Sequence, residues 1–239
     1  MSQTITQAMI LAAGFGTRLR PITDTVPKAM AMVDGKPLLD YAMGHAVSAG
    51  ARKIIVNTHY LPQVIEQHLQ RRPVTISHET EILETGGGVK NVITQFDDKE
   101  FYVINADSLW LDGANPLLNQ LAKKWDSGKM DALLALIPNK GQYPDLQGDF
   151  DLSPDGRLQR HGQSKPLPYH FMGVQILHPR LFDKSPTGRF SLNILYDQAE
   201  GQHRLYGHIA EGIEWFHIST PQDLQKTNVY FADKNQIAP

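Results

Sequence analysis

Short apolar runs alternate with amphipathic helical patterns along the first 137 residues, and this alternation restricts the possible folds most strongly. The apolar runs predict buried strands, and the helical patterns between them predict connections that cross over a sheet. We therefore expect an α/β domain whose sheet is mainly parallel and flanked by helices on both faces. The expected strands span 8–13, 53–57, 74–77, 101–104 and 132–137, and the expected helices span 37–49, 62–69, 86–95 and 114–125.

The pattern changes after Ile137, where prolines, glycines and shorter β-like runs follow. Runs over 148–152 and 169–177 predict a small, partly antiparallel lobe within about 138–220. A helix is expected over 192–199. A closing helix is expected to begin at residue 221; its helical pattern is clear as far as residue 231, and we expect the helix to end at about residue 236. We expect a single domain, because 239 residues bury one substantial core with at most a small appended lobe.

Composition excludes several classes of protein. A formal net charge of −2 and the lack of a basic run argue against a general nucleic-acid binder. No apolar stretch is long enough to cross a bilayer, and residues 1–7 lack the cationic start and apolar region of a signal peptide. The chain has no cysteine, which excludes disulfides and thiolate chemistry. We expect a soluble cytoplasmic protein, with a monomer as the simplest assembly, that binds neither membrane nor nucleic acid.

The first predicted strand ends in a glycine turn that carries concentrated positive charge. Residues 11–21 read Leu-Ala-Ala-Gly-Phe-Gly-Thr-Arg-Leu-Arg-Pro, and a lysine follows a short loop later. Glycines let backbone N–H groups approach phosphate oxygens closely, while Arg18, Arg20 and Lys28 supply charge. The turn lacks the Gly-Lys-Ser/Thr of a P-loop and has Leu19 where a dinucleotide fingerprint needs a small residue. It predicts a polyphosphate site, with a plain strand–helix turn as the simpler alternative.

A carboxylate stands at the end of another predicted strand. Asp107 follows the apolar run 101–104 after two residues. This is the edge at which open α/β sheets bind ligands, and Mg²⁺ is often held there by one or two carboxylates together with substrate phosphates. The sequence therefore predicts a metal ligand at Asp107, with a helix cap or Asx turn as the alternative.

The order of these residues resembles the signature of the sugar-1-phosphate nucleotidylyltransferases. The resembling segments span 14–23, 27–28, 35–39, 83–88, 105–107, 171–177 and the surroundings of Trp215, whereas about 139–168 matches poorly. The resemblance implies a Rossmann-like, mixed and mainly parallel sheet of the nucleotide-diphospho-sugar transferase type. It also implies a nucleotide-binding part over about 1–137, a sugar-binding lobe over about 138–220, and a C-terminal helix over 221–236.

The resemblance implies catalytic roles for three charged side chains. Arg18 would contact the β- and γ-phosphates, Lys28 the α-phosphate and the sugar phosphate, and Asp107 a divalent metal. Solvated surface charge is the alternative for Arg18 and Lys28, and Arg20 is expected at most to pair with an acidic neighbour. The implied nucleotide-binding residues are Leu11, Ala13, Gly14, Gly16, Thr17, Arg18, Lys28, Glu79, Glu84 and Asn105. The implied sugar-binding residues are Thr85, Gly86, Gly148, Lys165, Gly173 and Asn193.

The glycine run 86–88 is expected to open a helix. Its small residues would let a ring lie against the backbone, and the N-terminus of the helix would favour an anionic or hydroxyl-rich ligand.

The chain departs from the family pattern at two positions. Relatives usually carry a second metal-binding aspartate in a Trp-x-Asp segment, and this chain has His217 there. Imidazole is a poor ligand for Mg²⁺, so three alternatives stay open: Asp107 works with phosphates and water alone, the site favours Mn²⁺, or His217 contacts phosphate. Before Lys165, Ser164 replaces the glutamate of a Glu-Lys-Pro motif, which leaves an exposed loop lysine as the alternative reading of Lys165.

The implied reaction converts a sugar 1-phosphate and a nucleoside triphosphate into a nucleotide-sugar and pyrophosphate. Segments 83–88, 178–179 and 190–192 favour the short N-acetylmuramate-1-phosphate uridylyltransferases of bacterial cell-wall recycling. Mannose-1-phosphate guanylyltransferases and glucose-1-phosphate thymidylyltransferases are the alternatives within the family. A non-catalytic regulator that binds nucleotide-sugars is the alternative from another class, and pyrophosphate release distinguishes it from an enzyme.

Overall fold

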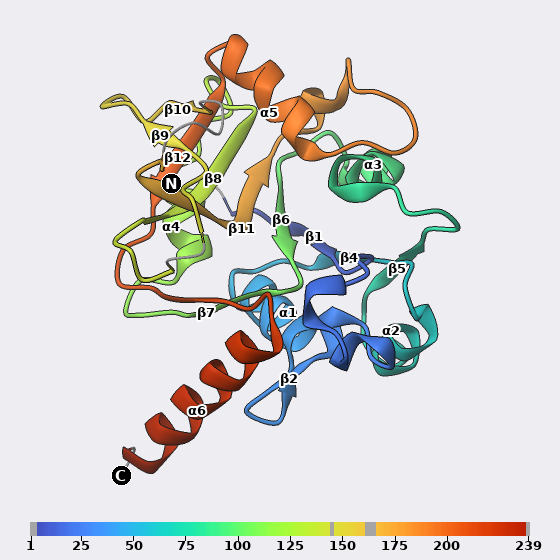
Figure 1. Cartoon of the computed structure of the whole chain (residues 1–239). Helices are drawn as coiled ribbons and strands as arrows, with labels where there is room; N and C mark the ends of the chain where they lie inside the picture. The colour runs from blue at the N-terminus through green and yellow to red at the C-terminus, as the bar shows by residue number, and fades with distance from the viewer. Residues whose placement is uncertain (1–3, 144–145, 161–165, 238–239) are drawn as a thin grey trace.

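A seven-stranded sheet forms the centre of the molecule, with helices on both of its faces (Figure 1). The structure is a computed structural model that describes residues 4–143, 146–160 and 166–237. In spatial order the strands are β12 (Leu205–Ile209), β8 (Ala132–Pro138), β11 (Tyr169–Leu177), β6 (Phe101–Asn105), β1 (Gln7–Leu11), β4 (Lys53–Thr58) and β5 (Thr75–His78).

The sheet is mixed and mainly parallel, as expected. Strands β6, β1, β4 and β5 run parallel to one another, and so do β12 and β8. Strand β11 lies between β6 and β8 and runs antiparallel to both. The carboxyl ends of β1, β4 and β6 therefore meet at one edge, where Leu11 pairs with Asn57 on one side and Asn105 on the other.

Each face of the sheet is covered by a separate set of helices. Helices α1 (Leu38–Ser48), α2 (Pro62–Leu69) and α4 (Leu117–Lys124) pack on one face, and α3 (Glu84–Val92) and α5 (Leu192–Gly201) pack on the other. Helix α1 illustrates the cause. Its buried residues recur at helical spacing, at 39, 42, 43 and 46, so one apolar stripe faces the strands. Gly50, at φ +94°, follows the end of the helix and allows the chain to turn toward β4.

Several boundaries differ from the sequence expectation by a few residues. Helix α3 begins at Glu84, two residues before the expected start, and a 3₁₀ segment over Ile93–Phe96 replaces its last turn. Helix α4 begins only after Pro116, whose φ suits the position before a helix. The closing helix α6 (Pro221–Ile237) is longer than the clearly patterned stretch that ended at 231. Further 3₁₀ turns span Thr17–Leu19, Ile22–Asp24, Lys28–Met30 and Pro179–Phe182.

The run 169–177 forms a strand, but the expectation that it belongs to a separate lobe is wrong. It is β11 of the central sheet, because its apolar side chains are buried on both faces between β6 and β8. Outside the sheet, β9 (Asp151–Leu152) and β10 (Leu158–Gln159) form a short antiparallel pair. The division of function between residues 1–137 and 138–220 stays a prediction.

Two small sheets and the last helix complete the described chain. Strand β13 (Glu214–His217) pairs antiparallel with β7 (Ser108–Leu111), and β2 (Met32–Val33) pairs with β3 (Lys36–Pro37). Helix α6 extends away from the sheet (Figure 1) and packs through Leu224 and Phe231 onto a small apolar cluster that contains Leu19. In the part of the chain that the structure describes, none of the helices combines the length and apolar character needed to cross a membrane.

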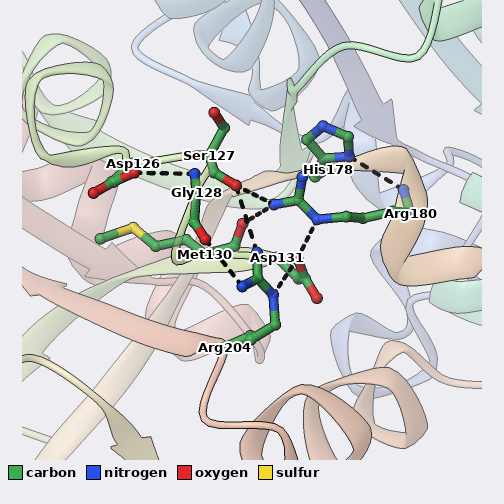
Figure 2. Close-up of polar contacts among 8 residues, drawn as sticks. All are labelled: Asp126, Ser127, Gly128, Met130, Asp131, His178, Arg180 and Arg204. Carbon is green, nitrogen blue, oxygen red and sulfur yellow. Dashed lines mark hydrogen bonds and ion pairs between the residues drawn. The ribbon is translucent and has the colours of Figure 1, made fainter.

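An arginine cluster stabilises the amino edge of the sheet, opposite to the edge where β1 and β6 end (Figure 2). Asp131, just before β8, accepts from Arg180 Nε at 2.5 Å and from Arg204 Nε at 2.8 Å. Arg180 Nη2 also donates to the carbonyls of Ser127 and Met130, at 2.5 and 2.6 Å. The guanidinium groups thus tie three separate segments together.

Candidate active site

A cavity of about 320 Å³ opens at the carboxyl edge of the sheet, where β1, β4 and β6 end. This is the edge at which α/β sheets bind ligands. The structure brings most of the nucleotide-site residues expected from the sequence to this cavity. They are Leu11, Ala13, Gly14, Gly16, Thr17, Arg18, Lys28, Glu84 and Asn105, together with Thr85 and Asp107.

The glycine turn is shaped so that Lys28 fits beneath it. Gly16 has φ +62°, a left-handed conformation that favours glycine, and a Cβ there would lie 2.8 Å from the Cβ of Lys28. The Gly16 carbonyl accepts from Leu19 N and Thr23 Oγ1, each at 2.9 Å, which fixes the turn. At Gly14 a Cβ would meet nothing within 4 Å, so the backbone there is open to a ligand.

Lys28 and Asp107 both line the cavity and form an ion pair there. Lys28 Nζ lies 2.6 Å from Asp107 Oδ2, and the side chains are 15 % and 38 % exposed. Arg18 lines the same cavity and is exposed, and among the described residues it makes no ion pair. Arg20 behaves as expected and pairs with Asp24 at 3.2 Å. The cavity therefore presents an unpaired guanidinium and a lysine to an anionic ligand.

His217 lies beside this pair, through the pairing of β13 with β7. It stands opposite Ser108 in the register and lines a neighbouring cavity of about 190 Å³ with Arg18, Lys28 and Asp107. Burial lowers the pKa of His217, and the positive charges of Lys28 and Arg18 lower it further against the opposing effects of Asp223 and Asp107. The imidazole is therefore neutral at physiological pH.

The donor set fits a metal that brings ligands of its own. Within residues 4–143, 146–160 and 166–237, no three His, Asp or Glu side chains gather closely enough to hold an ion alone. Asp107 offers a partly exposed carboxylate at the cavity, and His217 offers a neutral ring nitrogen in place of the family's second carboxylate. This set suits an oxygen-seeking cation only when phosphate oxygens complete its coordination.

Asn57 is a cavity residue that sequence reasoning missed. Its Oδ1 accepts from Ala12 N at 2.7 Å, and its Nδ2 donates to Glu79 Oε1 at 2.7 Å. Glu79, expected near the base, is only 2 % exposed and lies behind Asn57, where its Oε2 accepts from Leu83 N at 3.0 Å. The position of Asn57 at the carboxyl end of an apolar strand was the available signal.

The glycine run at the start of α3 serves packing within the protein, which corrects the expectation that a ligand ring lies there. A Cβ at Gly86 would lie 2.4 Å from the ring of Phe190, and one at Gly87 would lie 2.3 Å from the Gly188 carbonyl. The Phe190 carbonyl accepts from the N–H groups of Gly86 and Gly87, at 2.9 and 3.0 Å. These helix-start donors are therefore not available to a ligand.

Glu84 keeps a place at the cavity, where its carboxylate pairs with Arg189 at 2.7 Å.

A second cavity of about 250 Å³ adjoins the first. Thr85 and Asn105 line both cavities, and Asn193 lines the second, close to where the sequence expected the sugar. Asp149 and Arg160 also line it, and the poor match of 139–168 to the family pattern hid them. Burial raises the pKa of Asp149, against a hydrogen bond from Phe171 N at 2.9 Å.

The other expected sugar-side positions lie elsewhere. Gly173, at φ +74°, lines the cavity of His217, and a Cβ there would lie 2.2 Å from Ser108 Oγ. Gly148 allows a close backbone approach, because a Cβ there would lie 1.9 Å from the Leu167 carbonyl. Lys165 lies outside the described residues.

Comparison with known proteins agrees with the geometry. A family model described as nucleotidyl transferase matches residues 7–142. N-acetylmuramate alpha-1-phosphate uridylyltransferase of Caulobacter vibrioides is 37 % identical, over 93 % of this chain and 95 % of its own. The chain belongs to the nucleotidyl transferase family.

Further relatives support membership of the sugar-1-phosphate nucleotidylyltransferases within this family. N-acetylmuramate alpha-1-phosphate uridylyltransferase of Neisseria meningitidis serogroup B is 35 % identical, over 76 % of this chain and 79 % of its own. The structure of HddC from Yersinia pseudotuberculosis, complexed with GMP-PN, superimposes with a TM-score of 0.76. That structure is 23 % identical and covers 95 % of this chain and 100 % of its own, so it demonstrates the shared fold. This nucleotidyl transferase is accordingly an enzyme with the fold expected from its sequence.

Proposed function

We propose that the enzyme transfers a uridylyl group from UTP to N-acetylmuramate 1-phosphate, releasing pyrophosphate. One observation carries the proposal: two adjoining cavities share Thr85 and Asn105, and the Lys28–Asp107 pair lines the first. A nucleotide in the first cavity and a sugar phosphate in the second would place their reacting phosphates near this pair. Such positioning lowers the barrier without any covalent intermediate.

The chemistry requires a single displacement at the α-phosphorus of the nucleotide. An oxygen of the sugar phosphate attacks in line, and the bond to the β-phosphate oxygen breaks as pyrophosphate leaves. In this proposal the open backbone at Gly14 and the guanidinium of Arg18 bind the triphosphate. Lys28 neutralises charge that develops between the two substrates.

A divalent cation, Mg²⁺ or Mn²⁺, fits this scheme. Bound through Asp107 and the phosphates, it would neutralise charge on the leaving pyrophosphate. His217 would lie next to that ion without contributing negative charge. The role of Asp107 is then to hold the ion and to accept from Lys28, which it does at 2.6 Å in this structure.

The nature of the sugar is supported by charge in the second cavity. N-acetylmuramate carries a carboxylate on its lactyl group, and mannose and glucose do not. Among the described residues that line this cavity, Arg160 is the one permanent cation. Its Nη1 donates to Asp197 Oδ1 at 2.6 Å and to the Asn193 carbonyl at 3.2 Å. A guanidinium has five N–H donors, so in this proposal Arg160 would also bind the substrate carboxylate. The relatives at 37 % and 35 % identity are named for the same sugar.

The experiment is a substrate panel read by pyrophosphate release. N-acetylmuramate, mannose and glucose 1-phosphates are each combined with UTP, GTP and dTTP in Mg²⁺. The proposal expects the highest kcat/KM for UTP with N-acetylmuramate 1-phosphate. A higher kcat/KM for mannose 1-phosphate with GTP would contradict the proposal and indicate a mannose-1-phosphate guanylyltransferase. A higher kcat/KM for glucose 1-phosphate with dTTP would indicate a glucose-1-phosphate thymidylyltransferase. Binding without turnover for every pair would favour a regulator of nucleotide-sugar metabolism.

Because both substrates are phosphorylated metabolites, the proposal also places the enzyme in the cytoplasm.

A further inference from the structure

A side chain that lines the second cavity carries a buried amide nitrogen with no hydrogen-bond partner among the described residues. Gln175 of β11 is 1 % exposed and lines this cavity of about 250 Å³. Its Oε1 accepts from the Tyr196 hydroxyl at 2.7 Å, whereas its Nε2 has no hydrogen-bond partner among the described residues. A buried donor left unpaired destabilises the empty protein, so an acceptor is expected when the cavity is filled.

Tyr196 occupies the oxygen end of the Gln175 amide. The hydroxyl is enclosed by α5 and the sheet, and burial raises the pKa of Tyr196, so the group stays protonated. In this arrangement the phenol donates to the amide oxygen, which leaves the amide N–H₂ without a partner among the described residues. A ligand atom that pairs with this N–H₂ group would be an acceptor.

The side chains next to Gln175 are aromatic. The rings of Phe150, Phe171 and Tyr196 contact one another edge to face, with centroids 6.3 to 6.5 Å apart. All three residues line the cavity, and Leu192 adds an aliphatic surface. This part of the lining suits a small apolar group, whereas the other lining residues of the cavity are polar.

We propose that Gln175 determines specificity for an N-acetylated sugar, with Nε2 donating to the acetamido carbonyl while the methyl group packs on Phe150 and Phe171. The inference rests on the proposed function in one respect, namely that the second cavity holds the sugar. An acetamido group joins an acceptor to a methyl group, which is the combination that this wall presents. A hydroxyl could accept a hydrogen bond from Gln175, but it has no methyl group. The aromatic surface would then contact either water or the polar hydrogen of that hydroxyl.

The test compares matched substrates that differ only at the acyl group. Gln175→Leu keeps the size of the side chain and removes the donor. The substrates are N-acetylmuramate 1-phosphate and its analogue with a hydroxyl in place of the acetamido group. We expect the ratio of their kcat/KM values to fall about tenfold or more in Gln175→Leu, since a site that hydrogen-bonds a substrate group discriminates strongly. An unchanged ratio would overturn the proposal, because a merely structural glutamine lowers both values together.

Two control variants separate specificity from stability. Gln7→Leu alters another buried glutamine of the central sheet, which is 4 % exposed and donates to the Phe96 carbonyl at 2.8 Å, away from both cavities. It should lower the melting temperature and leave the substrate ratio as it is. Tyr196→Phe removes the group that orients the amide, and the ratio should fall to a value between those of the parent and Gln175→Leu. If Gln175→Leu does not fold, Gln175→Met replaces it with the same expectation.

A binding measurement keeps this inference distinct from the proposed function. Calorimetric titration compares UDP-N-acetylglucosamine with UDP-glucose, so no turnover of a muramate is needed. A loss of preference for the N-acetylated ligand in Gln175→Leu supports the inference even if N-acetylmuramate 1-phosphate is not the substrate. Equal affinity of the parent for both ligands refutes the inference even if N-acetylmuramate 1-phosphate is turned over.

Discussion

The two edges of the central sheet carry the same kinds of charged side chain, but these side chains bind one another at the amino edge and line a cavity at the carboxyl edge. At the amino edge, Asp131 is 8 % exposed and two arginines surround it (Figure 2). At the carboxyl edge, Asp107 is 38 % exposed and has Lys28 as its partner, while Arg18 stands nearby without an ion pair among the described residues. Both edges therefore combine one carboxylate with two cations.

The difference lies in how completely each donor is satisfied. Arg180 and Arg204 use their N–H groups on Asp131 and on backbone carbonyls, so little capacity is left for a ligand. At the carboxyl edge the cations face a cavity with donors to spare. Charged residues therefore indicate a binding site when their hydrogen bonds are incomplete, and a structural cluster when they are complete.

The largest expected effect is at the carboxyl edge. Lys28→Ala and Arg18→Ala should each lower kcat/KM by about a hundredfold or more, because each removes a charge aimed at the reacting phosphates. Their melting temperatures should stay close to that of the parent, as neither side chain supports the core. Steady-state pyrophosphate release with parallel thermal melts tests both statements, and near-parental turnover in both variants would refute the assignment of this edge.

The second effect concerns the partner of Lys28. Asp107→Asn preserves shape and removes the negative charge, so it should lower Mg²⁺-dependent activity by about fiftyfold, through loss of a metal ligand. The measurement is a titration of activity against Mg²⁺ in parent and variant. The same Mg²⁺ response in both would place the metal ligand on another residue.

The amino edge should respond in stability and not in catalysis. Asp131→Ala leaves two guanidinium groups facing each other, and because both are about a third exposed the expected cost is about 2 kcal/mol. For a chain of this size that corresponds to a melting temperature lower by about 4–8 °C. Specific activity well below the melting temperature should match the parent. A catalytic defect without loss of stability would contradict the comparison of the two edges.

The smallest effect concerns His217. A neutral imidazole beside Asp107 leaves the proposed metal site with one carboxylate, so the ion should bind weakly before the nucleotide arrives. His217→Asp should raise the affinity of the nucleotide-free enzyme for Mg²⁺ about fivefold, which calorimetric titration with Mg²⁺ and Mn²⁺ can measure. Tight Mg²⁺ binding by the parent, unchanged in the variant, would show that His217 lies outside the metal's coordination.

The sequence was most informative where local pattern decides structure. Strands β1, β4, β6 and β8 and helices α1 and α2 were predicted within a few residues, because each is an apolar run or stripe that is visible in the local sequence. The glycine turn also predicted a cluster at the carboxyl edge, since its residues are close in sequence as well as in space.

What the sequence could not supply depends on contacts between distant segments. Nothing local distinguishes a strand of the central sheet from a strand of a lobe, so β11 was misplaced. The glycines 86–88 suit a ligand or a neighbouring loop equally well, and only the position of Phe190 decides between them. The role proposed for Gln175 could not be predicted for the same reason, because it depends on a contact with Tyr196, 21 positions away.

The reversed direction of β11 has a consequence for how such enzymes can diversify. Strand β8 leaves the sheet at the carboxyl edge and β11 enters it at the same edge, so residues 139–168 form an excursion whose two ends are anchored side by side, with Asn139 N donating to the Pro168 carbonyl at 2.8 Å. An excursion of this kind can change in length or sequence without disturbing the register of the strands in the central sheet. In the proposed division of function, the nucleotide cavity could therefore stay the same while this excursion, which supplies Asp149, Phe150 and Arg160 to the proposed sugar cavity, changes.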